Sequence, residues 1–164
     1  MTRAELSLGP LSDQDHAFYG LVWAGTTLAA HVDRELTRTH GLPMSWFEVM
    51  LWLNGQPEPV AASDLGARTM LSRSQVSRVV DALAARGLVA RSPSPSDARS
   101  VRIALTEHGR RTFAEADAAR REILRPVFSG LLDETDIQAL ETVWRKLKQP
   151  HAEKRPDGPA EAGN

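Results

Sequence analysis

Cysteine is absent from the 164-residue chain. Without it the protein can form no disulfide framework, no zinc–thiolate site and no thiol redox switch. The sequence also lacks an apolar run of about 18 residues, the length that a membrane helix needs, and it shows no signal-peptide pattern. We therefore expect no membrane contact and a cytoplasmic location.

The chain as a whole has no excess of basic residues: its formal net charge is −1. The charges are nevertheless distributed unevenly along the chain. Residues 68–111 contain nine arginines and three acidic residues, so this segment carries +6 and the rest of the chain carries −7. Because attraction to phosphate depends on the local field, a basic segment on an acidic body suits a protein that binds DNA through one face.

Patterns typical of catalytic or metal-binding sites are missing as well. The five histidines show no metal-ligand spacing; they stand at positions 16, 31, 40, 108 and 151. A phosphate-binding loop, a nucleophile elbow and a dinucleotide-binding fingerprint are all absent. We predict that the protein is not an enzyme and uses no metal or cofactor.

The middle of the chain has the pattern of a helix-turn-helix. The sequence predicts a short helix over 61–68, a tight turn at 69–71 and a second helix over 72–86. Ser72 can cap the second helix, and Gln75 three residues later can complete a capping box. Apolar residues at helical spacing predict its buried stripe: Val76, Val79, Val80 and Leu83.

The opposite face of this second helix is polar at its amino-terminal end, which is the end that enters the major groove in this motif. We predict that six residues contact DNA there: Ser72, Arg73, Ser74, Gln75, Ser77 and Arg78. A solvated helix face that happens to hold two arginines is the alternative. The cap, the turn and the strands that follow favour DNA binding.

A β-hairpin is predicted after the second helix, as in a winged helix. Gly87 suits the helix end, where a positive φ is common. In the second strand Val101, Ile103 and Leu105 alternate with polar or small residues, so we expect them to face inward. The two prolines of segment 92–99 are expected to open the hairpin between the strands.

The tip of the hairpin contains Arg99, two residues after Asp97. An acid at this distance can hold a guanidinium in one orientation. We predict that Arg99 enters the minor groove of DNA and that Asp97 positions it. The alternative is an exposed surface pair of little energetic value.

Taken together, these segments resemble the MarR family of bacterial transcription regulators. The resemblance covers roughly residues 12–148 and is carried by Leu65-Gly66, Ser72–Leu83, Arg86–Val89, Asp97–Arg99 and Leu105–Arg110. It implies a winged helix-turn-helix, a dimer built from the terminal helices, and repression as the more common mode of action. One branch of that family senses peroxides through a cysteine, which this chain lacks.

Apolar spacing predicts further helices over 12–40, 44–54, 107–128 and 133–148, with Pro126 expected to kink or end the third. The first and the last two carry more apolar surface than one chain needs, which indicates a two-fold dimer; packing within one chain is the alternative. The predicted domains are a helical dimerisation region, a winged helix-turn-helix domain and a disordered tail: 12–40 with 107–148, 44–105 and 149–164.

A second face of the first helix carries Tyr19, Trp23 and Thr27, and we place it beside Trp46 and Met50 of the next helix. Members of the resembled family often respond to phenolic ligands at such a place. We therefore predict that a small aromatic or anionic effector binds there. The alternative is that these side chains are simply part of the core.

The predicted fold is mainly α with a small β-hairpin wing. The predicted function is that of a dimeric, sequence-specific DNA-binding transcription regulator, a repressor that binds a near-palindromic operator in double-stranded DNA and is released by its effector. The alternative is a winged-helix module that binds protein and has no DNA operator. Salt-dependent binding to random duplex DNA would separate the two.

Overall fold

The computed structural model describes residues 12–94 and 101–152. These residues form the following elements: α1 (Asp13–His40), α2 (Met44–Asn54), β1 (Val60–Ala61), α3 (Ala62–Arg68), α4 (Arg73–Ala85), β2 (Val89–Pro93), β3 (Val101–Leu105), α5 (Glu107–Phe128) and α6 (Glu134–Ala152). The mainly helical fold with a small antiparallel sheet confirms the predicted fold class. Packing divides the chain into two units, Met1–Ile123 and Leu124–Asn164. No helix within the described ranges has the length and apolarity to cross a membrane.

Helix α1 begins and ends at residues that local sequence rules select. The backbone N–H of Asp15 donates to Ser12 Oγ at 3.3 Å, and the backbone N–H of Ser12 donates to the Asp15 carboxylate at 3.2 Å. At the other end Gly41 has a φ of 61°, a conformation in which glycine avoids the penalty of a Cβ. Val32 and Leu36 are the buried residues of α1, so most of its apolar side chains lie at the protein surface.

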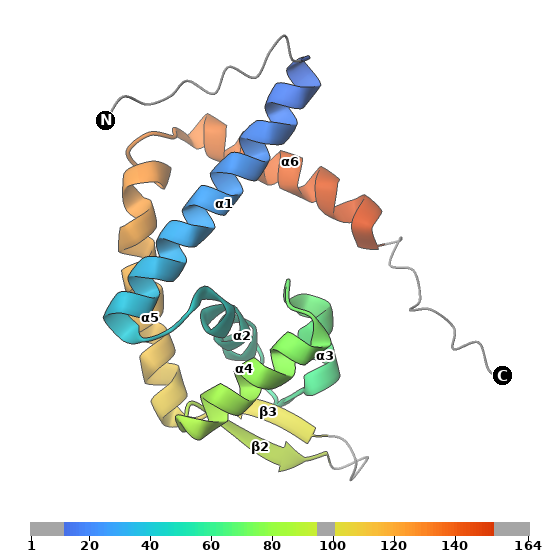
Figure 1. Ribbon diagram of the computed structural model, residues 1–164, viewed down its shortest axis with the longest axis vertical. Coiled ribbons are helices and arrows are strands. Elements are labelled where there is room, and N and C mark those ends of the chain that lie inside the picture. Colours follow the sequence, from blue (N-terminus) through green and yellow to red (C-terminus); the bar gives the residue numbers. More distant parts are fainter. Residues whose placement is uncertain (1–11, 95–100, 153–164) are drawn as a thin grey trace, which may run out of the picture. The chain divides into compact units, whose positions relative to one another are not determined.

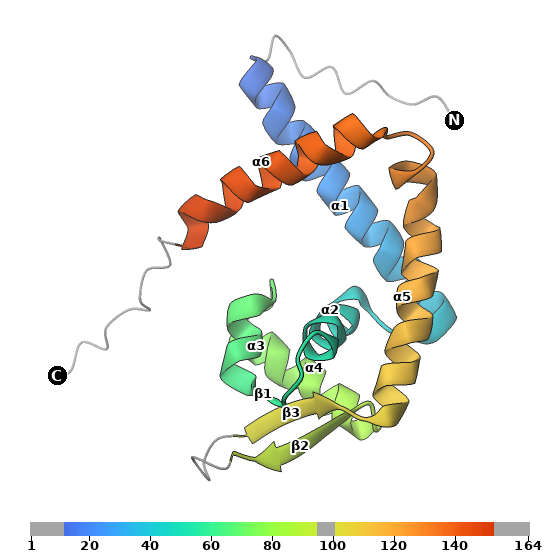
Figure 2. The same cartoon turned by 180° about the vertical axis from the view of Figure 1, so that it is seen from behind.

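Helix α2 lies in the middle of the first unit, with α3 and α4 on one side and the start of α5 on the other (Figure 1, Figure 2). Phe47 of α2 stacks on Phe113 of α5, with ring centroids 5.3 Å apart. The Asp33 carboxylate of α1 accepts a hydrogen bond from the backbone N–H of Met44 at 2.7 Å. Fully buried side chains of α2 and of the surrounding segments complete the core: Leu36, Leu42, Val49, Met50, Leu65, Leu83, Leu88 and Ile103.

The sheet contains one strand more than the sequence predicted. Its order is β1-β3-β2, and β1 pairs antiparallel with β3 through Val60 and Ile103. The Arg102 guanidinium donates to the backbone carbonyl of Pro59 at 2.9 Å, which holds the start of β1 against β3. Because β1 has two residues and follows a proline, it shows no alternation that a sequence pattern could detect.

The expected inward pattern of β3 is confirmed at two positions and wrong at the third. Ile103 and Leu105 are buried, whereas Val101 is 44% exposed. Val101 pairs with Pro93 at the outer end of the hairpin. This last pair reaches past the edge of the core, and Pro93 still belongs to β2, so the hairpin does not open at the first proline.

Helix α4 ends in a Schellman motif that turns the chain into β2, which confirms the predicted role of Gly87. This residue has a φ of 66° and its N–H donates to the Ala84 carbonyl at 2.9 Å. The N–H of Leu88 donates to the Leu83 carbonyl, also at 2.9 Å. Both leucine side chains are fully buried, so the turn is anchored in the core.

Helix α5 starts against the same turn. Thr106 Oγ1 accepts from the backbone N–H of Gly109 at 2.9 Å and donates to the Gly87 carbonyl at 2.7 Å. A Cβ at position 109 would lie 1.9 Å from the Leu88 carbonyl oxygen, so this close approach requires glycine.

Of the last two helices, α5 has the predicted bounds and α6 does not. Helix α5 continues through Pro126 to Phe128, so the proline does not end it. Helix α6 starts at a reciprocal cap, in which Asp136 N–H donates to Asp133 Oδ1 at 2.9 Å and Asp133 N–H donates to Asp136 Oδ2 at 3.1 Å. It extends to Ala152, four residues into the segment assigned to the tail. The rest of that segment, 153–164, lies outside the described residues.

Candidate nucleic-acid interface

The start of α4 is defined by the predicted capping box. Ser72 Oγ accepts from the backbone N–H of Gln75 at 3.3 Å, and Gln75 Oε1 accepts from the backbone N–H of Ser72 at 2.8 Å. Ser72 Oγ also lies 3.2 Å from Ser74 Oγ. Because the Gln75 oxygen is engaged in the cap, the amide nitrogen is the end of this side chain that could donate to a base.

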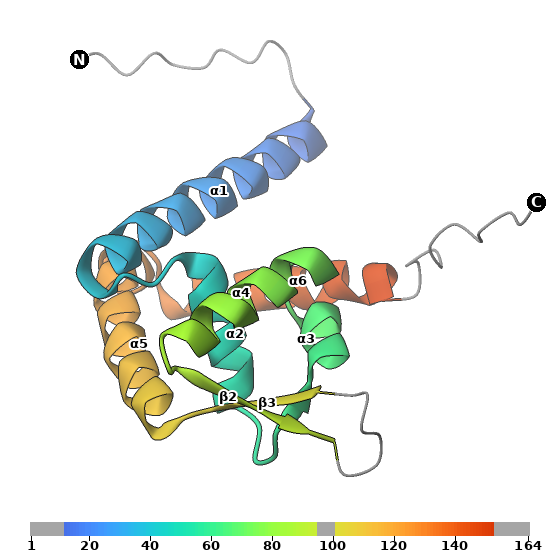
Figure 3. The ribbon, with the colours of Figure 1, turned by 60° about the horizontal axis from the view of Figure 1, so that its bottom comes forward.

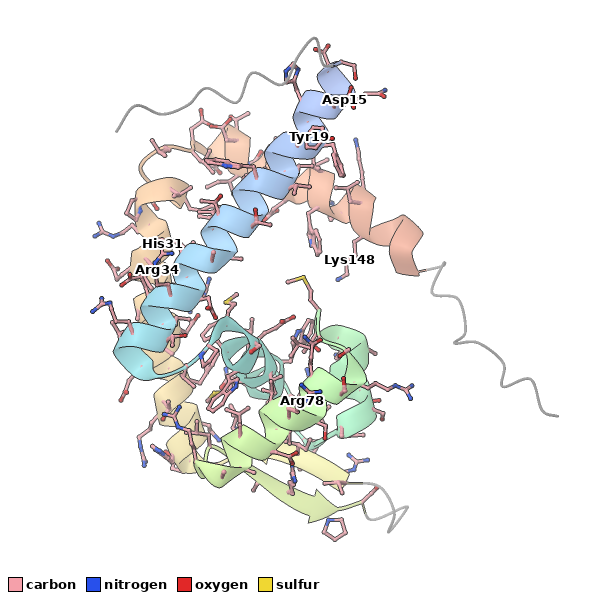
Figure 4. The ribbon with its side chains drawn as sticks, viewed as in Figure 1. Asp15, Tyr19, His31, Arg34, Arg78 and Lys148 are labelled. Carbon is pink, nitrogen blue, oxygen red and sulfur yellow. The ribbon has the colours of Figure 1, made fainter. Side chains whose placement is uncertain are left out.

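The polar face of α4 is exposed along its first turns, and Figure 4 shows Arg78 on this helix. All six residues predicted to contact the major groove lie on the surface: Ser72, Arg73, Ser74, Gln75, Ser77 and Arg78. On the other side of the helix Val76, Val79 and Val80 are buried. The apolar stripe therefore fixes which side of α4 faces outward. Contact of these six residues with DNA stays a prediction.

A cleft of about 380 Å³ lies beside this face. It is bounded by α4, by the start of α3 and by strands β2 and β3, whose arrangement is visible in Figure 3. Its lining combines buried apolar side chains (Val76, Val80 and Ile103) with exposed polar ones (Ser63, Arg73, Ser77, Asp81 and Arg91). Hydroxyl and guanidinium groups of this kind are donors to phosphate oxygens.

An ion pair connects α4 to the wing across this cleft. Arg91 of β2 donates to the Asp81 carboxylate of α4. The two side chains are 41% and 61% exposed, respectively. No sequence pattern reveals this pair, because its partners stand ten residues apart on different elements and no helical or strand spacing relates them.

The base of the wing is described and its tip is not. Arg102 of β3, besides its bond to Pro59, directs Nε to Ser94 Oγ at 3.5 Å. Arg102 thereby joins the residue before β1 to the residue after β2. The predicted minor-groove residues Asp97 and Arg99 lie outside the described residues, so their role stays a prediction.

The residues predicted to form an effector pocket differ in their exposure within one chain. Tyr19 lies near the amino-terminal end of α1, the end away from α2 (Figure 4). Tyr19 and Trp23 are 47% and 57% exposed, and Thr27 is exposed. Trp46 is half-buried, and Met50 is fully buried in the core. The α1 side chains and the α2 side chains therefore occupy different environments.

Helix α4 is tied to the other end of α1 by a residue that the sequence analysis did not select. Arg86, the C-cap residue of α4, donates a hydrogen bond to the Gly41 carbonyl at 2.7 Å. Its guanidinium carbon also lies 5.5 Å from the ring centroid of Trp46. No local spacing pattern signals this contact, because Gly41 and Arg86 are 45 residues apart.

A second missed cluster lies on α5. The largely buried Asp117 carboxylate accepts from Arg120 at 2.8 Å and from Arg121 at 2.6 Å. Arg120 also lies over the Phe47 ring at 5.6 Å. The spacing of three and four residues could have revealed these pairs. In the part of the chain that the structure describes, no three histidine or acidic side chains gather into a metal site.

Comparison with known proteins agrees with this geometry. A model described as the MarR family matches residues 40–100, the segment that contains α2, α3, α4 and strand β2 of the hairpin. The transcriptional repressor IacR of Pseudomonas putida is 25% identical over 147 residues, which cover 85% of this chain and 86% of IacR.

Two solved structures extend the likeness over most of the fold. A MarR-family transcriptional regulator from Rhodococcus sp. RHA1 is 30% identical, with a TM-score of 0.71 and coverage of 80% of this chain and 92% of that one. CouR from Rhodococcus jostii RHA1, solved bound to p-coumaroyl-CoA, is 32% identical, with a TM-score of 0.69 and coverage of 79% and 90%. With this identity and coverage on the same fold, the chain belongs to the MarR family of winged helix-turn-helix transcription regulators.

Proposed function

We propose that the protein is a sequence-specific repressor that acts in the cytoplasm and reads the major groove of double-stranded DNA with α4. The observation that carries this proposal is the exposed polar face at the capped end of α4, backed by buried valines that fix its orientation. Arg73 and Arg78 supply cations there, and arginine is the residue most suited to bidentate contact with guanine.

The active unit of the proposal is a homodimer on a near-palindromic operator. The terminal helices 12–40 and 107–148 are assigned to dimerisation, and 44–105 is assigned to DNA binding. Support comes from large apolar side chains that a single chain leaves exposed on α1 and α6: Phe18, Leu21, Val22, Trp23, Leu140, Val143, Trp144 and Leu147. Two-fold symmetry would place the two copies of α4 in successive major grooves, about 34 Å apart.

Release by a small aromatic or anionic effector completes the proposed function. The related CouR was solved with p-coumaroyl-CoA bound, which supports control by a small molecule. The proposed residues are Tyr19, Trp23, Thr27, Trp46 and Met50. Since Met50 is buried within one protomer, the site requires the partner chain or a repacking of α2 to bring them together. An effector releases DNA only if it binds more tightly to the arrangement that does not fit the operator.

One experiment tests whether the protein binds DNA in a sequence-specific way. A preferred duplex is selected from a random pool, and its affinity is compared with that of a scrambled duplex across a range of salt concentrations. A sequence-specific regulator prefers the selected duplex and shows a linear fall of log affinity with log salt. A winged-helix module that binds only protein would show neither behaviour.

A further inference from the structure

The Asp81–Arg91 ion pair contributes little to the stability of the fold. Both side chains are substantially exposed, and pairs of this kind contribute less than about 1 kcal/mol to folding. Its position is more informative, because both residues line the cleft beside the DNA-reading face. Among the described residues that line the cleft, three are charged: Arg73, Asp81 and Arg91.

The spacing on α4 aligns the pair with the proposed DNA contacts. Arg73, Ser77 and Asp81 follow one another at intervals of four residues, so they occupy one side of the helix. A rise of about 1.5 Å per residue puts Asp81 about 12 Å along the axis from Arg73. This stripe faces the wing across the cleft, and Arg91 approaches it from β2. If α4 enters the major groove and the wing enters the minor groove, as proposed above, the DNA sugar-phosphate backbone between the two grooves passes this side of the protein.

We propose that Asp81 limits the sequence-independent affinity for DNA, because it holds the Arg91 guanidinium and withholds it from DNA phosphates. This inference rests on the proposed DNA-binding function. Asp81 cancels one cation at the edge of the interface, so it lowers the sequence-independent part of the affinity while the base-reading residues of α4 are unaffected. The pair keeps the protein from binding tightly to random DNA.

Substitution of Asp81 should therefore strengthen non-specific binding through Arg91. An arginine that gains a phosphate contact adds about 0.9 to the magnitude of the salt slope on duplex DNA. It follows that the affinity gain of Asp81→Asn over the wild type should shrink about 3.5-fold when the salt concentration rises fourfold. Random duplex should gain at least as much as the operator, so the ratio of the two affinities should not rise.

The test uses the full-length protein with four variants, Asp81→Asn, Arg91→Ala, the double variant and Glu35→Gln. Affinity is measured by fluorescence anisotropy on random duplex and on the selected operator at several salt concentrations. Glu35→Gln is the matched control: it too removes a carboxylate paired with an arginine, but on α1. Hydrogen bonds from Arg38 lower the pKa of the Glu35 carboxyl, so this substitution also removes one negative charge.

The inference expects Asp81→Asn to bind random duplex more tightly with a steeper salt slope, and expects no such gain when Arg91 is already alanine. Glu35→Gln should leave the slope unchanged. An equal gain in the Arg91→Ala background would mean that Asp81 repels phosphate directly, and it would overturn the inference. An unchanged or shallower slope for Asp81→Asn would also overturn it. If the wild type itself showed no salt-dependent binding, the proposed function would be the part that fails.

Discussion

Arg86 at the end of α4 donates a hydrogen bond to the carbonyl of Gly41 at the end of α1, over a distance of 2.7 Å. The same guanidinium lies over the ring of Trp46, so it joins three helices at one point. Gly41 itself adopts a left-handed conformation that presents this carbonyl. The orientation of the proposed recognition helix is thus linked to the long helix assigned to dimerisation.

Arg86→Ala should lower the free energy of unfolding by about 1–2 kcal/mol, because it removes a charge-assisted hydrogen bond and a cation–π contact. Urea denaturation measures this change. Arg86→Lys should recover part of the loss, since an ammonium group can donate to Gly41 but lacks the planar guanidinium that lies over Trp46. Arg110→Ala, at an exposed position on α5, serves as the control and should be nearly neutral. A neutral Arg86→Ala would show that this joint contributes nothing.

Arg73→Ala and Arg78→Ala should each weaken operator binding by about 1–3 kcal/mol, which is roughly 5- to 150-fold. Both side chains are exposed, so the melting temperature should stay within about 2 °C of the wild type. Anisotropy on the selected operator measures the affinity. Arg38→Ala on α1 removes an exposed arginine away from α4 and should leave it unchanged. Wild-type affinity in both α4 variants would exclude this face as the reader.

Arg99→Ala should weaken binding to many sequences and reduce the salt slope by about one unit, because an arginine in the minor groove contacts phosphate-rich surroundings and reads groove width. It should also remove any preference for A·T pairs that flank the major-groove site. Asp97→Ala should act in the same direction but more weakly, since the cation remains. Selection of preferred sites with each variant measures both effects. If Arg99→Ala bound DNA with full affinity and an unchanged salt slope, the wing would be only a structural hairpin.

Gly109→Ala should destabilise the fold by about 3 kcal/mol and lower the melting temperature by roughly 6 °C or more. The new Cβ would lie 1.9 Å from a backbone oxygen of Leu88, and neither α5 nor the turn before β2 can move without disturbing the core. Calorimetry measures the change. Gly20→Ala is the control, because a Cβ there meets no atom within 4 Å and alanine favours a helix by up to about 1 kcal/mol.

Trp144→Asp should convert a dimer into a monomer. The side chain is 61% exposed in one chain and lies on the apolar face of α6. If a second copy covers this face, the new carboxylate would be buried without a partner, which is strongly unfavourable. Sedimentation equilibrium should give twice 18.0 kDa for the wild type and 18.0 kDa for the variant. Lys146→Asp puts the same charge on an exposed polar position of α6 and should stay dimeric. A monomeric wild type at micromolar concentration would contradict the proposed symmetry.

Much of the candidate site could be predicted from residues close together in the chain. The capping box of Ser72 and Gln75, the buried stripe beginning at Val76 and the glycine end of α4 at Gly87 are all confirmed. Each depends on interactions within about five residues, so the local order of side chains determines it. The same local rules also determined where α1 starts and ends.

Contacts between distant segments were decided by the tertiary structure alone. Strand β1 exists because Val60 meets Ile103, and Val101 is exposed because its strand reaches past the core. The pairing of Asp81 with Arg91 and the bond from Arg86 to Gly41 likewise join residues that no helical or strand period relates. The sequence by itself thus determined the helices, their caps and the polar face of α4. Packing decided that Asp81 pairs with Arg91 and that Gly109 must be glycine, because these contacts arise only when separate elements are brought together.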